Sequence, residues 1–257
     1  MGKVIADLAA SAASATLSVE NATSSVNYVL SKTDGAAGEF LKTDGSGALS
    51  FASAAGGFHQ MVVRSVTGSA TYSPAAGVTK LVVAVQGAGG GGGGGHSTGY
   101  GSGGSAGGYA LKFFTGVAST DVMTVVVGLG GNGYAGGGNG TAGGASQFVS
   151  VSGGLHPFTT VEGLGGGEGK YNTYSEVAGV ASGGDINIDG ERGGTNSGGN
   201  YLAGASMLGF AGARYGTDVG AAKASTGYGA GGTGAYSVVN GVGEPGRNGV
   251  VIIWEYK

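Results

Sequence analysis

The apolar residues of the chain gather in short runs that are rich in β-branched and aromatic side chains, and glycine-rich stretches separate these runs. Such runs are typical of β-strands. Strands of this number and length favour an all-β fold, an antiparallel β-sandwich. The expected strands are 61–64, 70–72, 79–85, 109–114, 122–127, 146–151 and 250–256.

Glycine makes up 63 of the 257 residues, against about 7% in an ordinary domain. Locally the glycines lie three positions apart, which is the repeat of a polyproline II helix. Such helices have no internal hydrogen bonds, so glycine-lined faces can pack together and pair their amides and carbonyls sideways. We expect the segments 87–108, 128–145 and 163–249 to leave the sandwich at strand ends and pack as polyglycine II helices. The clearest triplets are Gly101, Gly104 and Gly107, and Gly243, Gly246 and Gly249.

Two other interpretations of the glycines fail. The run from Gln86 to Gly95 follows an apolar strand, as in a dinucleotide-binding loop, but almost no helix-forming residues follow it. Collagen requires strict Gly-X-Y with abundant proline, and the chain has only 3 prolines.

The N-terminal part has a different composition. Residues 1–30 are rich in alanine and serine and favour a helical or extended attachment segment with contacts through Val4, Leu8 and Leu17. Residues 31–57 contain a repeated Lys-Thr-Asp-Gly unit, and Asp-Gly pairs favour hairpin turns. We therefore expect an attachment segment (1–30), a hairpin linker (31–57) and a glycine-rich sandwich domain (58–257).

Charge and cysteine content exclude several classes. Charged residues make up 11% of the chain and the net charge is −3, so the basic footprint of a nucleic-acid-binding protein is missing. Cysteine is absent, which excludes disulfides and thiolate metal sites. The start of the chain lacks a run of signal-peptide length, and no stretch approaches 18 apolar residues, so we expect no membrane insertion.

Candidate chemistry is sparse. Asp185, Asn187 and Asp189 match the first half of a calcium loop, but position twelve is Asn196 and the flanks do not favour helices, so a strand ending in an Asp-Gly turn is favoured. His59, His96 and His156 lie far apart, and no catalytic signature is present. Carboxylate pairs such as Glu162 with Glu168 are better explained by surface solvation. We expect no enzyme activity and no cofactor.

Tyrosines recur throughout the glycine region. Tyrosine and asparagine are enriched at recognition surfaces because they make adaptable contacts at low entropic cost. The alternative is that tyrosines cover the glycine layers or mediate contacts between copies. The segments 170–176 and 201–218 are the best recognition candidates, because polar and aromatic residues displace glycine there; the named candidates are Tyr171, Tyr174, Asn200, Tyr201, Arg214 and Tyr215.

Two stretches resemble bacteriophage proteins. The run Phe40-Leu-Lys-Thr-Asp-Gly-Ser-Gly-Ala-Leu-Ser-Phe51 resembles a linker of tail-fibre and other virion appendage proteins. The glycine-rich domain at fibre tips is resembled by four stretches in order: Ser73-Pro-Ala-Ala-Gly-Val-Thr-Lys-Leu-Val-Val-Ala-Val-Gln-Gly-Ala-Gly-Gly, then Gly107-Gly-Tyr-Ala, then Met123-Thr-Val-Val-Val-Gly-Leu-Gly-Gly, and then Gly246-Arg-Asn-Gly-Val-Val-Ile-Ile-Trp-Glu-Tyr256. In its alternation of glycine-rich runs and loops, the domain is also similar to the polyglycine-sandwich adhesins of phages.

The resemblance implies a fibre or spike on the virion whose distal domain recognises a bacterial surface glycan or outer-membrane protein. It also implies a homotrimer that contacts other virion proteins through its N-terminal segment. Alternatives from other classes are a structural or capsid decoration protein without a receptor, an ice-binding protein and a surface glycan hydrolase.

Overall fold

The computed structural model describes residues 3–7, 16–21, 24–29, 39–44, 49–53, 57–97, 99–150, 160–175, 177–195, 201–213, 224–236 and 241–257. The chain divides into two compact units, Met1–Gly57 with Lys257, and Phe58–Tyr256. The described residues form strands and no helix, so the predicted all-β fold is confirmed. None of them forms a helix long and apolar enough to cross a membrane.

The first unit contains a three-stranded antiparallel sheet and a hairpin. The sheet has the order β1 (Lys3–Asp7), β2 (Thr16–Asn21), β3 (Ser24–Val29), so of the helical and extended alternatives for this segment the extended one is found. Val4 pairs with Val19 and Leu17 with Ala6, while Leu8 lies outside the described residues. The linker hairpin pairs β4 (Glu39–Thr43) with β5 (Leu49–Ser53).

The second unit begins with an antiparallel sandwich. One sheet has the order β14-β9-β8-β19-β6 and the other has the order β13-β12-β11-β10-β7. All seven strand predictions are confirmed within two or three residues at their ends. The seven predicted strands are β6 (Phe58–Arg64), β7 (Gly68–Tyr72), β8 (Lys80–Gln86), β9 (Tyr109–Thr115), β10 (Met123–Val127), β11 (Ser146–Ser150) and β19 (Val250–Tyr256). The two sheets also contain the short strands β12 (Val161–Gly163), β13 (Ala181–Ser182) and β14 (Ile186–Ile188).

The core lies between these two sheets. Phe148, Leu81, Met123 and Ile253 are fully buried there, and the Phe148 ring centroid lies 5.7 Å from that of Phe114. On β10, β11 and β19 such buried side chains alternate with partly buried ones, because successive residues of a strand face opposite sides. Their burial supplies the stiff frame on which the glycine segments begin and end.

The carboxyl group of Glu255 is buried beside this core. Glu255 is fully buried and accepts hydrogen bonds from the Tyr72 hydroxyl (2.7 Å) and from Gln60 Nε2 (2.9 Å). Burial, followed by the hydrogen bond to Glu255, raises the pKa of the Tyr72 phenol well above its ordinary value. The network satisfies the carboxylate with neutral donors on two edge strands.

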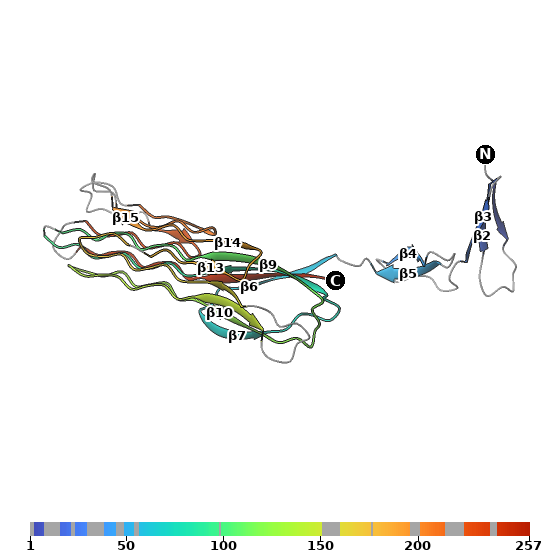
Figure 1. The fold of residues 1–257 in the computed structure, drawn as a ribbon, viewed down its shortest axis with the longest axis horizontal. Coiled ribbons are helices and arrows are strands. Elements are labelled where there is room, and N and C mark those ends of the chain that lie inside the picture. Colours follow the sequence, from blue (N-terminus) through green and yellow to red (C-terminus); the bar gives the residue numbers. More distant parts are fainter. Residues whose placement is uncertain are drawn as a thin grey trace. The chain divides into compact units, whose positions relative to one another are not determined.

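The glycine-rich segments extend from the strand ends as a bundle, seen as the long ribbons on the left of Figure 1. Segment 87–95 is its centre, and every one of its residues is buried. Its N–H groups donate in a strict three-residue rotation: residues 87, 90 and 93 to segment 101–108, residues 88, 91 and 94 to segment 138–145, and residues 89, 92 and 95 to segment 241–249. This rotation is the repeat of polyglycine II helices.

The carbonyl groups of segment 87–95 complete a hexagonal arrangement. They accept N–H groups from the segments 128–136, 163–171 and 228–236. The three segments that donate N–H groups to the central segment run parallel to it. The three segments that accept its N–H groups run antiparallel to it, and segments of the two kinds alternate around it. Each net hydrogen bond contributes about 0.5–1.5 kcal/mol, comparable to the roughly 0.5–1 kcal/mol entropic cost of ordering a glycine, so the lattice needs nearly every amide to be paired.

Segment 101–108 is a second enclosed centre. It bonds to the segments 87–95, 163–171, 177–181, 189–195, 201–206 and 228–236, and all its residues are buried. The bundle has three layers of segments. The middle layer holds the two centres together with 128–136 and 189–195. One outer layer is formed by 138–145, 163–171 and 177–181, and the other by 241–249, 228–236 and 201–206. Short pairs add to this region: β15 (Gly194–Thr195) with β16 (Tyr201–Leu202), and β17 (Gly209–Phe210) with β18 (Thr226–Gly227).

Gln86 lies where sheet pairing changes to lattice pairing. It is the last residue of β8 and is fully buried. Its Nε2 donates to Gly107 O at 2.8 Å and lies 3.2 Å from Gly108 O and 3.3 Å from Gly87 O. The side chain therefore supplies a donor to carbonyls at the transition, where the sheet ladder has ended.

Candidate functional site

The bundle ends in a set of loops on the side away from the sandwich. Segment 87–95 leaves β8 at residue 87, so whatever contacts Gly95 lies at the far end. The Tyr236 carbonyl lies against Gly95, and the Tyr134 carbonyl lies against Gly94. We call this end the tip; its described residues are 95–97, 99–101, 134–139, 170–175, 201–202 and 236.

Three tyrosines form an aromatic cluster at the tip. The ring centroid of Tyr201 lies 6.0 Å from that of Tyr100 and 5.9 Å from that of Tyr236, within the range of favourable aromatic pairs. Tyr201 is only 4% exposed, whereas Tyr100 is 37% exposed. The cluster therefore joins three separate segments of the bundle, with Tyr201 as its buried centre.

Tyr171 packs on glycine backbone. Its ring lies against Gly99 and Gly137, and a Cβ atom on Gly99 would overlap it. The Tyr171 N–H donates to Asn139 Oδ1 at 2.9 Å. Two loops that are distant in sequence are thereby held together.

Asn172 fixes the next step of the same loop. Its φ of 54° lies in the left-handed region, which asparagine tolerates better than most residues. Its N–H donates to Tyr100 O (2.8 Å), and its Oδ1 accepts from Tyr100 N–H (3.2 Å). This reciprocal pair positions Tyr174, which is 56% exposed at the end of the loop.

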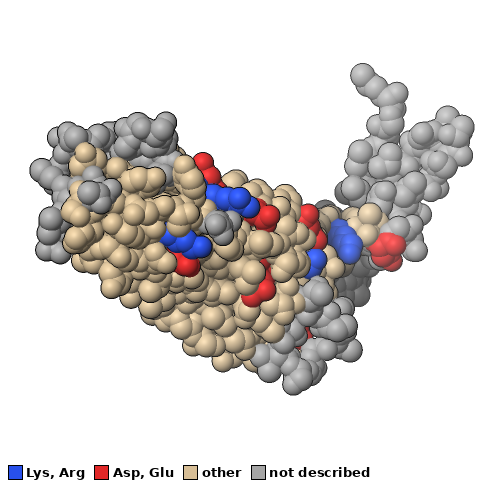
Figure 2. All heavy atoms as spheres, turned by 60° about the vertical axis from the view of Figure 1, so that its left-hand side comes forward, with Lys and Arg blue, Asp and Glu red and all other residues tan. Residues whose placement is uncertain are grey.

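Tyr134 is the other strongly exposed tyrosine of the tip. It is 49% exposed, and one part of its ring lies against Gly138. On the face drawn in Figure 2, charged side chains are few, and broad uncharged areas separate them. Among the described tip residues, Lys170 is the single Lys, Arg, Asp or Glu. With aromatic rings held on an ordered backbone, the tip can therefore bind by stacking and hydrogen bonding more readily than by ion pairing.

The sequence candidates divide accordingly. Tyr171, Tyr174 and Tyr201 come together at the tip, Tyr174 exposed and Tyr201 buried. Asn200, Arg214 and Tyr215 lie outside the described residues, as does His156. The sequence pattern favoured segments 170–176 and 201–218, so three further tyrosines of the tip were passed over: Tyr100, Tyr134 and Tyr236. Each of these follows a glycine-rich run at a place where the chain turns, and this position could have indicated them in the sequence.

The candidate calcium residues lie on and beside β14. Asp185 accepts hydrogen bonds from Phe113 N–H (2.8 Å) and from Lys112 Nζ (3.0 Å). The Phe113 bond first, and then the Lys112 bond, hold the pKa of its carboxyl below the ordinary value. Asn187 Oδ1 accepts from Gly184 N–H, and Asp189 Oδ1 from Ala181 N–H, both at 3.0 Å. Within the described ranges, no group of three metal-ligating side chains gathers. The favoured strand at 186–188 is present, and the oxygens serve to position the backbone.

Comparison with known proteins gives one family. No curated protein matches the chain. The model of a family described as "Glycine-rich domain" matches residues 64–256, a span that runs from the end of β6 through the whole bundle to the end of β19. Because this match covers most of the chain, the protein belongs to the glycine-rich domain family.

Proposed function

We propose that the protein is a bacteriophage fibre or spike whose glycine-rich domain recognises a receptor on the host-cell surface, and that it acts by binding without catalysis. The observation that carries the proposal is the exposure of Tyr134 and Tyr174 on loops that an ordered lattice holds in place. The resemblance of residues 40–51 and of the sandwich to virion appendage proteins supports the same role.

The lattice suits recognition because it fixes the loops before binding. Tyr171 and Asn172 tie loop 170–175 to its neighbours, so little further ordering is needed when a ligand binds. Rigid aromatic anchors gain affinity mainly by avoiding that ordering cost. A receptor surface of glycan or outer-membrane protein would meet the tip first.

The first unit is proposed to attach the protein to other virion proteins and to copies of itself. A two-stranded hairpin is marginally stable alone, and β4 exposes Phe40 and Leu41, which are successive residues and so face opposite sides. Contacts on both faces would stabilise it, as in a homotrimer on the virion. Several copies would also add avidity to weak receptor contacts.

A specific observation also favours a second candidate, a structural or capsid decoration protein without a receptor. Tyr201 is buried between Tyr100 and Tyr236, so these rings stabilise the tip itself. If Tyr134 and Tyr174 have no ligand, the bundle is a spacer.

The test is binding of the fluorescently labelled full chain to a panel of bacterial strains. The variant carries Tyr134→Ala and Tyr174→Ala together, and the matched control is Phe113→Ala, an aromatic residue 50% exposed on the sandwich. We expect saturable binding to some strains, competition with phage adsorption on those strains, and loss of binding only in the tip variant. Absence of binding by the folded chain on strains that the phage infects would favour the structural protein.

A further inference from the structure

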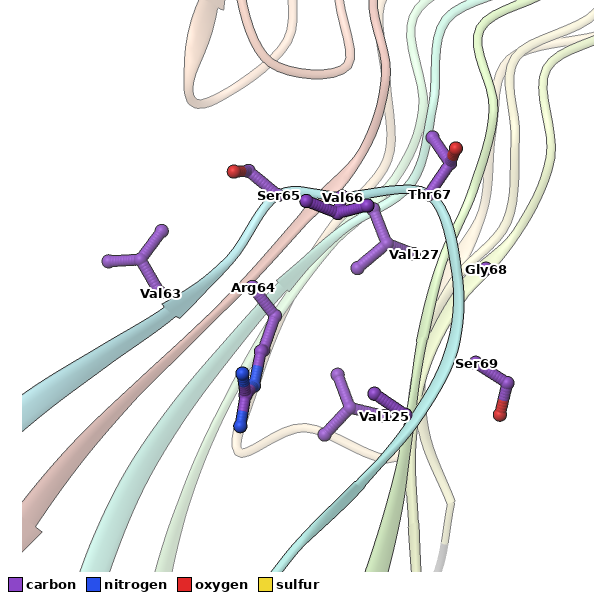
Figure 3. A pocket seen from close by; sticks show the side chains of 10 residues that line it. Val63, Arg64, Ser65, Val66, Thr67, Gly68, Ser69, Val125 and Val127 are labelled. Atoms are coloured by element: carbon purple, nitrogen blue, oxygen red, sulfur yellow. The ribbon is translucent and has the colours of Figure 1, made fainter.

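On one side of the sandwich, both sheets end in a strand that pairs with a single neighbour among the described residues. β6 ends one sheet and β7 ends the other, and residues 65–67 cross between them. A cavity of about 200 Å³ lies under this crossing. Figure 3 shows the side chains that line it. Its position is distinct from the tip, because it lies among the strands.

Arg64 faces this cavity from the inner side of β6. Gln60 reaches the buried Glu255, and Val62 packs against the core, so the alternation of a strand places Arg64 on the same inward face. In Figure 3 its guanidinium extends into the space beside Val125. Among the residues that the structure describes, the Arg64 side chain makes no ion pair or hydrogen bond, although its charge acts on the Tyr72 phenol and opposes the rise of that pKa.

The rest of the cavity is mostly aliphatic. Val125 and Val127 of β10 form a floor that belongs to the buried core, and Val63 and Val66 lie at the opening. Ala70 alternates with the buried Tyr72 and so faces inward, yet it remains exposed because the cavity opens over it. The space therefore joins an aliphatic wall to a single guanidinium group.

We propose that this cavity binds a carboxylate carried on a short aliphatic group. The guanidinium matches a carboxylate through two parallel charge-assisted hydrogen bonds, and the valines match the aliphatic part. Its volume is below the roughly 300–1,000 Å³ of pockets for drug-sized ligands, which limits the ligand to a fragment of that kind. This site is independent of receptor binding at the tip.

Two sources present the same chemistry. One is a free short-chain acid, and the other is the C-terminal residue of a protein when that residue is valine, leucine or isoleucine. Among the described strands, β6 and β7 each have one unpaired edge, along which a peptide could continue outward from the cavity. The experiment has an arm for each source.

The test is a titration of the isotope-labelled full chain, followed by its amide chemical shifts. The first probe is 3-methylbutanoate, with the uncharged isostere 3-methylbutanamide as its control. The second probe is the peptide acetyl-Gly-Gly-Val with a free C-terminus, with its C-terminal amide as control. We expect saturable shifts confined to residues 63–70 and 125–127, and affinity for the charged form at least about tenfold higher. Tighter binding of the peptide than of 3-methylbutanoate would identify a protein C-terminus as the source, and the reverse a free acid.

Three variants decide the matter. Arg64→Gln should weaken carboxylate binding by about tenfold, and Ala70→Leu should abolish it by filling the cavity. Lys80→Gln removes a positive charge at the start of β8, far along the sheet from Arg64, and should leave carboxylate binding unchanged. An inward charge on an edge strand can also serve only to prevent pairing between copies. If neither carboxylate binds the native chain, or if the uncharged probes bind equally well, the proposal is wrong. A change of self-association in Arg64→Gln would then assign Arg64 to preventing pairing between copies.

Discussion

Gly92 and Thr233 lie so close in the bundle that a Cβ atom on residue 92 would approach the Thr233 carbonyl oxygen far within 3.0 Å. Gly92 also donates its N–H to Glu244 O (2.9 Å) and accepts from Tyr134 N–H (3.1 Å). The space is filled by backbone on every side, so neither a side chain nor a rotamer change can relieve the contact. Glycine is required here for close packing, because the lattice spacing is set by hydrogen bonds between backbones.

Replacing Gly92 by alanine should therefore destabilise the domain strongly. Overpacking typically costs 1–3 kcal/mol, and the rigid backbone contacts here place the cost at roughly 3 kcal/mol or more. For a domain of this size that corresponds to a fall of roughly 6–12 °C in the unfolding temperature, measured by calorimetry. Gly194→Ala is the matched control, because no atom lies within 4 Å of its added Cβ. Equal unfolding temperatures for the two variants would contradict the packed lattice.

Gln86 offers a test of the junction between sheet and bundle. Gln86→Met keeps the length of the side chain but removes the donor to Gly107 O. A buried acceptor without a partner costs about 1–3 kcal/mol, so we expect a lower unfolding temperature. Hydrogen exchange should also accelerate at the first residues of segment 87–95. Unchanged protection of these amides from hydrogen exchange would mean that the Gln86 side-chain amide does not stabilise the junction between β8 and segment 87–95.

Much of this architecture could be predicted because its signals are local. β8 and β19 are marked by runs of apolar residues rich in valine and isoleucine, and triplets such as Gly101, Gly104 and Gly107 mark the polyglycine II repeat. The two-residue β13 carries too little pattern to be recognised. Thr16–Asn21 does alternate, with Leu17 and Val19 on one face, but alanine and serine around it made a helix an equal alternative.

The arrangement of the bundle could not be predicted in the same way. A glycine face has no side chain to specify its partner, so nothing in the sequence says that Gly90 donates to Ser105 O or that Gly91 donates to Thr141 O. Neighbours are set by which strand end each segment leaves and re-enters. For the same reason the tyrosine content predicted a recognition surface, but only the lattice distinguishes buried Tyr201 from exposed Tyr174.

Stability at high pH should depend on Tyr72. Its raised pKa means that the folded state favours the neutral phenol, so this contribution is fully present below the unfolded pKa of about 10. Above that value the unfolded state loses the proton first, and stability should fall by up to about 1.4 kcal/mol per pH unit. Denaturant titrations of the native chain and Tyr72→Phe from neutral to alkaline pH measure this.

The Tyr72→Phe variant should be less stable at neutral pH, by about 1–3 kcal/mol, because Glu255 loses its 2.7 Å donor. Its alkaline decline should be shallower than that of the native chain, because one ionisation is removed. Glu255→Gln is the companion variant: it retains Tyr72 and removes the buried charge. Identical alkaline slopes for Tyr72→Phe and the native chain would show that Tyr72 does not control this region.

Calcium should leave the stability of the domain unchanged. Oxygens of Asp185, Asn187 and Asp189 already accept protein N–H groups, so metal binding would have to break these bonds. We expect the same unfolding temperature with added calcium and with a chelator. A rise with calcium that Asp189→Asn abolishes would instead establish a site at β14.

Tyr201 and Tyr174 should separate stability from binding. Tyr201→Ala removes the buried centre of the cluster with Tyr100 and Tyr236, and loss of a buried aromatic side chain costs roughly 3–5 kcal/mol. Tyr174→Ala removes a side chain that is 56% exposed, so its effect on unfolding should stay within about 0.5 kcal/mol. Under the proposed receptor role, Tyr174→Ala should nevertheless weaken cell binding. If both variants bind cells as the native chain does, the tip is not the recognition surface, because a loosened cluster and a missing exposed ring would each have altered it.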